Sequence, residues 1–136
     1  MYLRRMVKSV PVTLATTAVA VMIATPALAA PHGISGTCYQ NGAIYVSQTV
    51  RFMTATTYIS ASFSSLPRNG LVFGTQTQSG TFLGQNTWSN SEIGITRNVS
   101  NRRYGRGQGF VNFFRLASAC PQGGCSPYNF VGSENY

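Results

Sequence analysis

Residues 110–119, FVNFFRLASA, form the most apolar stretch of the chain after its first thirty residues. In a β-strand, alternate side chains point to opposite faces, so Phe110, Phe114 and Leu116 lie on one face. A face this apolar is best explained by burial against another sheet. The opposite face is also largely apolar, which is typical of a strand in the middle of a sheet. We therefore predict that this stretch is a central strand.

The overlapping residues 106–113, RGQGFVNF, fit the octamer of RNA-recognition domains at every fixed position except the third. In those domains, aromatic rings at the third and fifth positions stack on bases. Here the third residue is Gln108, and the fifth, Phe110, is predicted to be buried. The chain also has no candidates for the two helices that such a domain packs beneath its sheet. We therefore predict no RNA-recognition domain.

Further strand patterns occur upstream of this stretch. Residues 57–63 alternate, with Ile59, Ala61 and Phe63 on one face, and residues 92–99 alternate in the same way. Asn41 and Gly42 readily form a tight turn, which predicts a hairpin between residues 38–40 and 43–46. Shorter strands are predicted at residues 71–73 and 81–83, and a loop at residues 100–109.

These patterns together define the fold class. After the first thirty residues, no segment keeps the i, i+3, i+4, i+7 apolar spacing of a helix for three turns. About seven short strands with frequent turns predict an all-β fold, a small antiparallel β-sandwich. A small β-barrel is the alternative. Residues 30–136 have room for a single domain.

The first 29 residues have the pattern of a secretory signal peptide. Basic residues at positions 4, 5 and 8 precede an apolar run over residues 10–23, and Ala27-Leu28-Ala29 provides small residues before a cleavage site. The apolar run is shorter than the roughly 20 residues of a membrane-spanning helix, and no second long run follows. We therefore expect a secreted, extracellular product without a transmembrane segment. Asn98-Val99-Ser100 is a glycosylation sequon whose use depends on the host.

Charged residues are few and nearly all basic. The chain has no Asp and two Glu, and residues 30–136 carry seven Arg, which gives a net charge of +5 after cleavage. Arginine binds phosphate and carboxylate groups through its planar fork. We therefore predict that an anionic polymer, surface or protein binds at a flexible loop and its neighbours, through Arg97, Arg102, Arg103, Tyr104 and Arg106. The alternative is a solvated loop that only increases solubility.

Three cysteines, Cys38, Cys120 and Cys125, follow the predicted signal peptide. A disulfide is expected outside the cell. Cys120 and Cys125 can close a small ring, or Cys38 can pair with one of them, and spacing alone does not decide between these pairings. The third thiol is then free or joins two chains in a covalent dimer.

Residues suited to catalysis are scarce. With one His and no Asp, a serine triad is excluded, and the cysteines lack a fourth ligand for zinc. We predict no catalytic residue, metal or cofactor, and a secreted, basic, non-catalytic binding module. A cationic antimicrobial or toxin-like effector is the alternative. A weaker alternative is a metal-independent nuclease that uses His32, Glu92 and an Arg, although His32 lies close to an end expected to be poorly ordered.

Export and processing of the chain can be tested directly. When the full chain is expressed in a secreting host, the product in the medium should begin at Ala30, because the small residues Ala27 and Ala29 fit a signal peptidase site. Intact-mass measurement and N-terminal sequencing of the product would check this. An intracellular product that keeps residue 1 would contradict it.

Overall fold

The computed structural model describes residues 31–122, 124 and 126–136, so the predicted signal peptide lies outside the described residues. The described part of the chain forms β-strands and no helix. In chain order the strands are β1 (Pro31–Thr37), β2 (Tyr45–Val46), β3 (Arg51–Phe52), β4 (Ser60–Ser65), β5 (Leu71–Gln76), β6 (Phe82–Trp88), β7 (Arg97–Asn98), β8 (Gly109–Leu116) and β9 (Asn129–Asn135).

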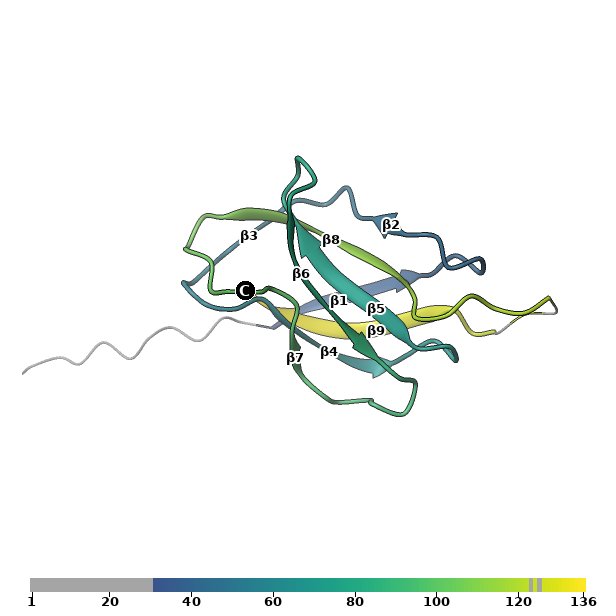
Figure 1. Cartoon of the computed structure of the whole chain (residues 1–136). Coiled ribbons are helices and arrows are strands. Elements are labelled where there is room, and N and C mark those ends of the chain that lie inside the picture. Colours follow the sequence, from purple (N-terminus) through teal and green to yellow (C-terminus); the bar gives the residue numbers. More distant parts are fainter. Residues whose placement is uncertain (1–30, 123, 125) are drawn as a thin grey trace, which may run out of the picture.

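The strands form two antiparallel sheets that face each other (Figure 1). One sheet has the order β1-β9-β4-β7, and the other has the order β2-β8-β5-β6, with β3 pairing alongside β2 on β8. The predicted small β-sandwich is therefore confirmed. The described residues hold nine strands where about seven were expected, and three of the nine have only two residues.

Aromatic rings fill the space between the sheets. Phe130 of β9 lies edge-on to Phe63 of β4 and to Phe73 and Phe114 of the facing sheet, with ring centroids 5.7, 5.9 and 4.7 Å apart. Phe63 also contacts Trp88 of β6, with ring centroids 4.8 Å apart. Edge-to-face pairs at these distances stabilise a core beyond the burial of their area. This cluster joins strands from both sheets at the centre of the sandwich.

The prediction of a central strand is confirmed for residues 110–116, because β8 lies between β5 and the short strands β2 and β3, whereas residues 117–119 lie beyond its end. Phe110 and Leu116 are fully buried between the sheets, together with Phe114. A buried Phe110 presents no ring to a nucleic-acid base. On the opposite face, Val111 and Phe113 are buried as well.

The alternating pattern of residues 57–63 correctly predicts the buried face of β4, although the strand begins only at Ser60, whereas the pattern of residues 92–99 fails. Ile59, Ala61 and Phe63 are buried as expected. In the second segment, Ile93 and Ile95 are exposed and only Arg97–Asn98 forms a strand, β7. The carboxylate of Glu92 accepts a hydrogen bond from the backbone N–H of Ser89, which closes a turn where a strand was predicted.

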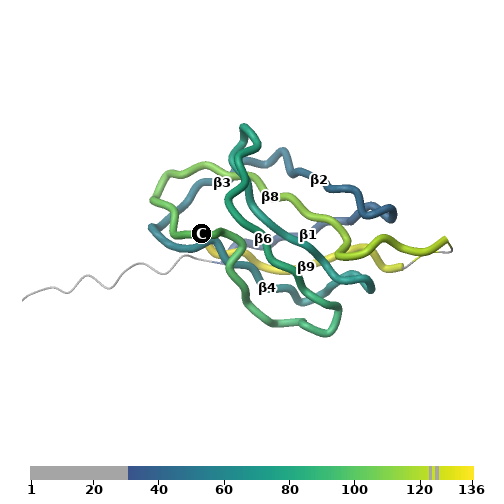
Figure 2. Tube along the Cα trace, viewed as in Figure 1, coloured from purple at the N-terminus to yellow at the C-terminus, as the bar shows by residue number. Residues whose placement is uncertain are grey.

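The first predicted hairpin is also wrong, although its turn exists. The N–H of Gly42 donates to the carbonyl of Tyr39, and Gly42 has the positive φ of 76° that glycine adopts readily. The chain on either side does not pair. It leaves β1 in one sheet and enters β2 in the other, so the turn connects the two sheets at one end of the sandwich (Figure 2).

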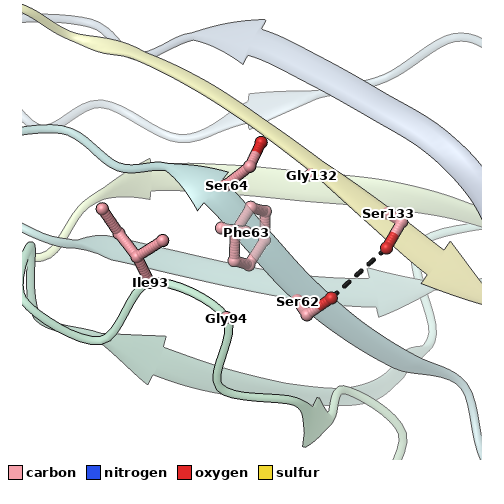
Figure 3. A pocket seen from close by; sticks show the side chains of 7 residues that line it. All are labelled: Ser62, Phe63, Ser64, Ile93, Gly94, Gly132 and Ser133. Carbon is pink, nitrogen blue, oxygen red and sulfur yellow. Dashed lines mark hydrogen bonds between the residues drawn. The ribbon is translucent and has the colours of Figure 1, made fainter.

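The C-terminal strand β9 was missed by the sequence patterns, yet it lies inside its sheet between β1 and β4. Gly132 of β9 lies opposite Phe63 of β4 (Figure 3), at a point where an added Cβ would be 2.3 Å from the carbonyl oxygen of Ser62. The Oγ atoms of Ser62 and Ser133 lie 3.3 Å apart beside it. Gly132 is therefore required by close backbone approach.

This close approach predicts the effect of adding one methyl group. Gly132→Ala should lower the free energy of unfolding by about 1–3 kcal/mol, the usual effect of overpacking a tight site. Gly33→Ala on β1 is the matched control, because a Cβ there meets nothing within 4 Å. Urea denaturation of both variants would measure the difference, and equal effects would contradict the assignment of Gly132.

Candidate functional site

The basic loop, residues 101–108, connects β7 to β8 at the end of the sandwich opposite the β1–β2 turn (Figure 2, green, at the left). Backbone hydrogen bonds fix it at three points. The N–H of Asn101 donates to the carbonyl of Leu83 at 2.7 Å, and the N–H of Gly107 donates to the carbonyl of Met53 at 2.9 Å. Between these points, Tyr104 and Thr57 each donate a backbone N–H to the carbonyl of the other. The loop was expected to be flexible, but these bonds attach it to the body of the sandwich.

Tyr104 anchors the loop and does not form part of its exposed surface. Its side chain is only 8% exposed and packs into the core, and its hydroxyl donates to Oδ1 of Asn101 at 3.0 Å. The guanidinium of Arg102 lies over the Tyr104 ring, 5.2 Å from its centroid. The prediction that Tyr104 contacts a ligand therefore has no exposed ring to support it.

Arg97 has a structural role outside the basic loop. Its guanidinium donates to both carboxylate oxygens of Glu92 and to the carbonyl of Thr87, and it lies 5.6 Å from the centre of the Trp88 ring. The hydrogen bonds from Arg97 and from the backbone of Ser89 lower the pKa of Glu92 to about 2. Arg97 therefore holds the segment between β6 and β7 in place.

Arg102, Arg103 and Arg106 remain together on the basic loop, and all three are exposed. The guanidinium groups of Arg103 and Arg106 have no hydrogen-bond or ion-pair partner among the described residues. The chain holds only two carboxylate side chains, and both are occupied by other arginines, Glu92 by Arg97 and Glu134 by Arg51. The positive charge of the loop is therefore not neutralised by an acidic side chain.

Phe52 is a further exposed residue at this end, which the sequence patterns did not identify. It lies on β3 opposite Gly109, the residue that follows the basic loop, and its side chain is 60% exposed. Its neighbours Arg51 and Met53 point inward, so period-2 alternation around Met53 could have indicated an outward Phe52. The end of the sandwich that carries the three arginines therefore also carries an exposed aromatic ring.

A second group of polar residues lies between the sheets at the same end. We call it the inter-sheet cluster: Glu134 of β9, Asn112 of β8 and Arg51 of β3. Nδ2 of Asn112 donates to Oε2 of Glu134 at 3.0 Å, and Nε of Arg51 lies 3.6 Å from the same oxygen. Glu134 is 0% exposed, and desolvation raises its pKa to about 7 although Asn112 and Arg51 oppose the shift. The cluster joins the two sheets by polar contacts.

His32 lies next to this cluster and not at a disordered end. It belongs to β1, directly opposite Glu134 of β9, and its ring stacks on Tyr136 with centroids 4.3 Å apart. Its Nε2 atom is buried without a hydrogen-bond partner, as are Oδ1 of Asn112 and Oε1 of Glu134. The expectation of a poorly ordered His32 was wrong. Its neighbouring carboxylate is Glu134, whereas Glu92 is bound to Arg97.

Cys38 is a free thiol, so the pairings that join it to Cys120 or Cys125 are wrong. Its side chain is 3% exposed, and burial raises its pKa to about 11. A protonated, enclosed thiol is a poor nucleophile, which does not favour a covalent dimer through Cys38. The pairing of Cys120 with Cys125 lies outside the described residues, because Cys125 does.

Shallow hollows also occur on the surface. The hollow in Figure 3 has a volume of about 340 Å³ and lies beside β4 and β9, where serine hydroxyls, Phe63 and Ile93 line it without a charged group. A second hollow, of about 370 Å³, lies at the end of the sandwich near Arg68, Asn69 and Trp88. Neither one brings together groups that could act as acid and base.

Within the residues described, no three His, Cys, Asp or Glu side chains gather to hold a metal ion. The same part of the chain contains no helix long and apolar enough to cross a membrane. No protein-family model, curated protein or solved structure matches the chain.

The inter-sheet cluster predicts that stability depends on pH. Because folding raises the pKa of Glu134 from 4.5 to about 7, its contribution is fully present below pH 4.5 and is lost as the pH rises through 7. This shift corresponds to a loss of about 3 kcal/mol. The melting temperature should therefore fall between pH 5 and pH 8, and Glu134→Gln should remove most of that fall.

Glu92→Gln is the matched control for this experiment. The pKa of Glu92 is lowered to about 2, so its contribution is present above pH 4.5 and is lost only as the pH falls through 2. This variant should keep the fall in melting temperature between pH 5 and pH 8. An unchanged pH dependence in Glu134→Gln, measured by thermal unfolding, would contradict the role assigned to Glu134.

Proposed function

We propose that the chain is a secreted, non-catalytic binding module whose basic loop binds an anionic polymer or surface outside the cell. One observation carries the proposal. Arg102, Arg103 and Arg106 are exposed together on a loop that backbone bonds hold in place, and both glutamates of the chain are engaged elsewhere.

A fixed loop favours binding because fewer conformations are lost when the partner docks. Each guanidinium offers a planar set of donors that matches phosphate, sulfate or carboxylate groups. The exposed ring of Phe52 adds an apolar contact at the edge of the same surface. The excess of arginine over glutamate would also attract a polyanion from a distance, an effect that salt weakens.

Two other functions are alternatives. An antimicrobial or toxin-like effector would use the same cationic surface, and killing of susceptible cells by the purified protein would identify it. The nuclease hypothesis receives no support from the positions of its residues. His32 lies opposite the buried Glu134, and the carboxylate of Glu92 is held by Arg97.

The proposal predicts retention on a heparin column, which carries sulfate and carboxylate groups. Arg103→Gln/Arg106→Gln should elute at clearly lower salt than the wild type, because two unpaired guanidinium groups are removed. This pair leaves the Arg102–Tyr104 contact in place. On a short DNA duplex, three loop arginines predict a log–log salt slope near −3, and the double variant should lower its magnitude by about 2.

The matched control is Arg68→Gln/Arg115→Gln, which removes the same charge at positions away from the basic loop. If retention depends on the loop, this control should elute close to the wild type. Equal shifts for the two double variants would mean that net charge alone causes retention, and the loop would lose its role. Circular dichroism of each variant would check that the fold is intact.

A further inference from the structure

Strand β1 forms an edge of its sheet, and no other described residue pairs with one side of its backbone. Among the described strands, β1 pairs only with β9, in a register that places Pro31 opposite Asn135 and Thr37 opposite Asn129. The N–H of Cys38 donates to the carbonyl of Tyr128, so the even-numbered residues of β1 direct their backbone groups toward β9. The N–H and C=O groups of Gly33, Ser35 and Thr37 therefore point away from the sheet.

Natural edge strands usually carry charges, prolines or bulges that prevent another strand from pairing with them. β1 has few of these protections. Its sequence PHGISGT contains no Lys, Arg, Asp or Glu, its Pro31 is at the first position, and its pairing with β9 is regular over seven residues. The exposed side chains beside the unpaired backbone, Gly33, Ser35 and Thr37, are small.

Hollows lie on both sides of this edge. A groove of about 340 Å³ lies between β1 and β2, with Tyr45 and Phe114 among its lining residues. A hollow of about 260 Å³ lies toward β9, lined by Asn129, Phe130 and Val131. Ser35, Gly36 and Thr37 line both. A strand added at β1 would point its alternate side chains to these two sides.

We propose that the partner at this edge is a second copy of the chain, which pairs its own β1 with the first in antiparallel fashion. This surface is separate from the basic loop, so the inference does not depend on the proposed function. A two-fold axis beside Ile34 would place Gly33 opposite Ser35 of the second copy and Pro31 opposite its Thr37. All seven residues of β1 would then be paired, and the two sheets would join into one continuous sheet.

The outward backbone groups match this register. The residues that point away from β9 are all odd-numbered, and a two-fold axis at Ile34 pairs odd residues only with odd residues. The Gly33–Ser35 pairs would exchange four backbone hydrogen bonds across the interface. On the inner side, His32 of one copy would lie opposite Gly36 of the other, which has no side chain of its own and is covered by the rings of Phe114 and Phe130.

Charge also favours a second copy at this edge over other orientations. Two molecules with this excess of arginine repel each other, and the repulsion is smallest where the surfaces carry the least charge. β1 contains no Lys, Arg, Asp or Glu. The basic loop, in contrast, carries three exposed arginines and is unsuited to self-association.

Sedimentation of the purified protein from low micromolar to millimolar concentration tests the proposal. The mass should rise from one chain to two, and the amides of Gly33, Ser35 and Thr37 should exchange more slowly with deuterium as the dimer forms. Ser35→Pro removes an N–H that β9 does not use, so it should weaken the dimer roughly tenfold or more without unpairing β9. Ser35→Lys should weaken it by charge repulsion.

Ser65→Lys is the matched control, because Ser65 is exposed on β4, away from this edge. It should dimerise like the wild type. A mass of one chain at every concentration, with fast exchange at the three odd-numbered amides, would overturn the proposal. A dimer that persists unchanged in both Ser35 variants would also overturn it, because the interface would then lie elsewhere.

Discussion

The contact of Phe130 with three aromatic rings is the interaction on which the rest of the sandwich depends. Phe130 comes from β9, and its partners come from β4, β5 and β8, so one side chain touches strands of both sheets. These rings pack edge to face, and this packing holds the two sheets against each other. The polar contacts of Glu134 extend the same junction toward the end of the sandwich where the basic loop is attached.

The scarcity of acidic residues leaves the surface of the basic loop positively charged. With two glutamates in the whole chain, each carboxylate serves one structural purpose, and neither is placed beside the basic loop. Glu92 and Glu134 show how differently the same side chain behaves. Hydrogen bonds from Arg97 and Ser89 lower the pKa of Glu92, whereas desolvation raises that of Glu134. The two glutamates therefore differ in pKa because they occupy different positions in the fold.

The amino-acid sequence predicted the parts of the fold that are apolar and alternate, such as β8 and β4. It missed β1 and β9, because Gly33, Gly36, Gly132 and Ser133 interrupt any apolar pattern in strands that pair through their backbones. The three loop arginines were predicted as a group. Their lack of an acidic partner, and the separate roles of Arg97 and Tyr104, depend on contacts between distant segments that no local pattern records.

The position of β9 has a consequence for how the chain reaches its folded state. β9, the last described strand in chain order, lies between β1 and β4, so the first sheet has a gap in its middle until β9 has been made. A chain that lacks β9 therefore cannot form the aromatic junction between the two sheets, because Phe130 is missing. This strand order therefore delays completion of the sandwich until β9 has been made.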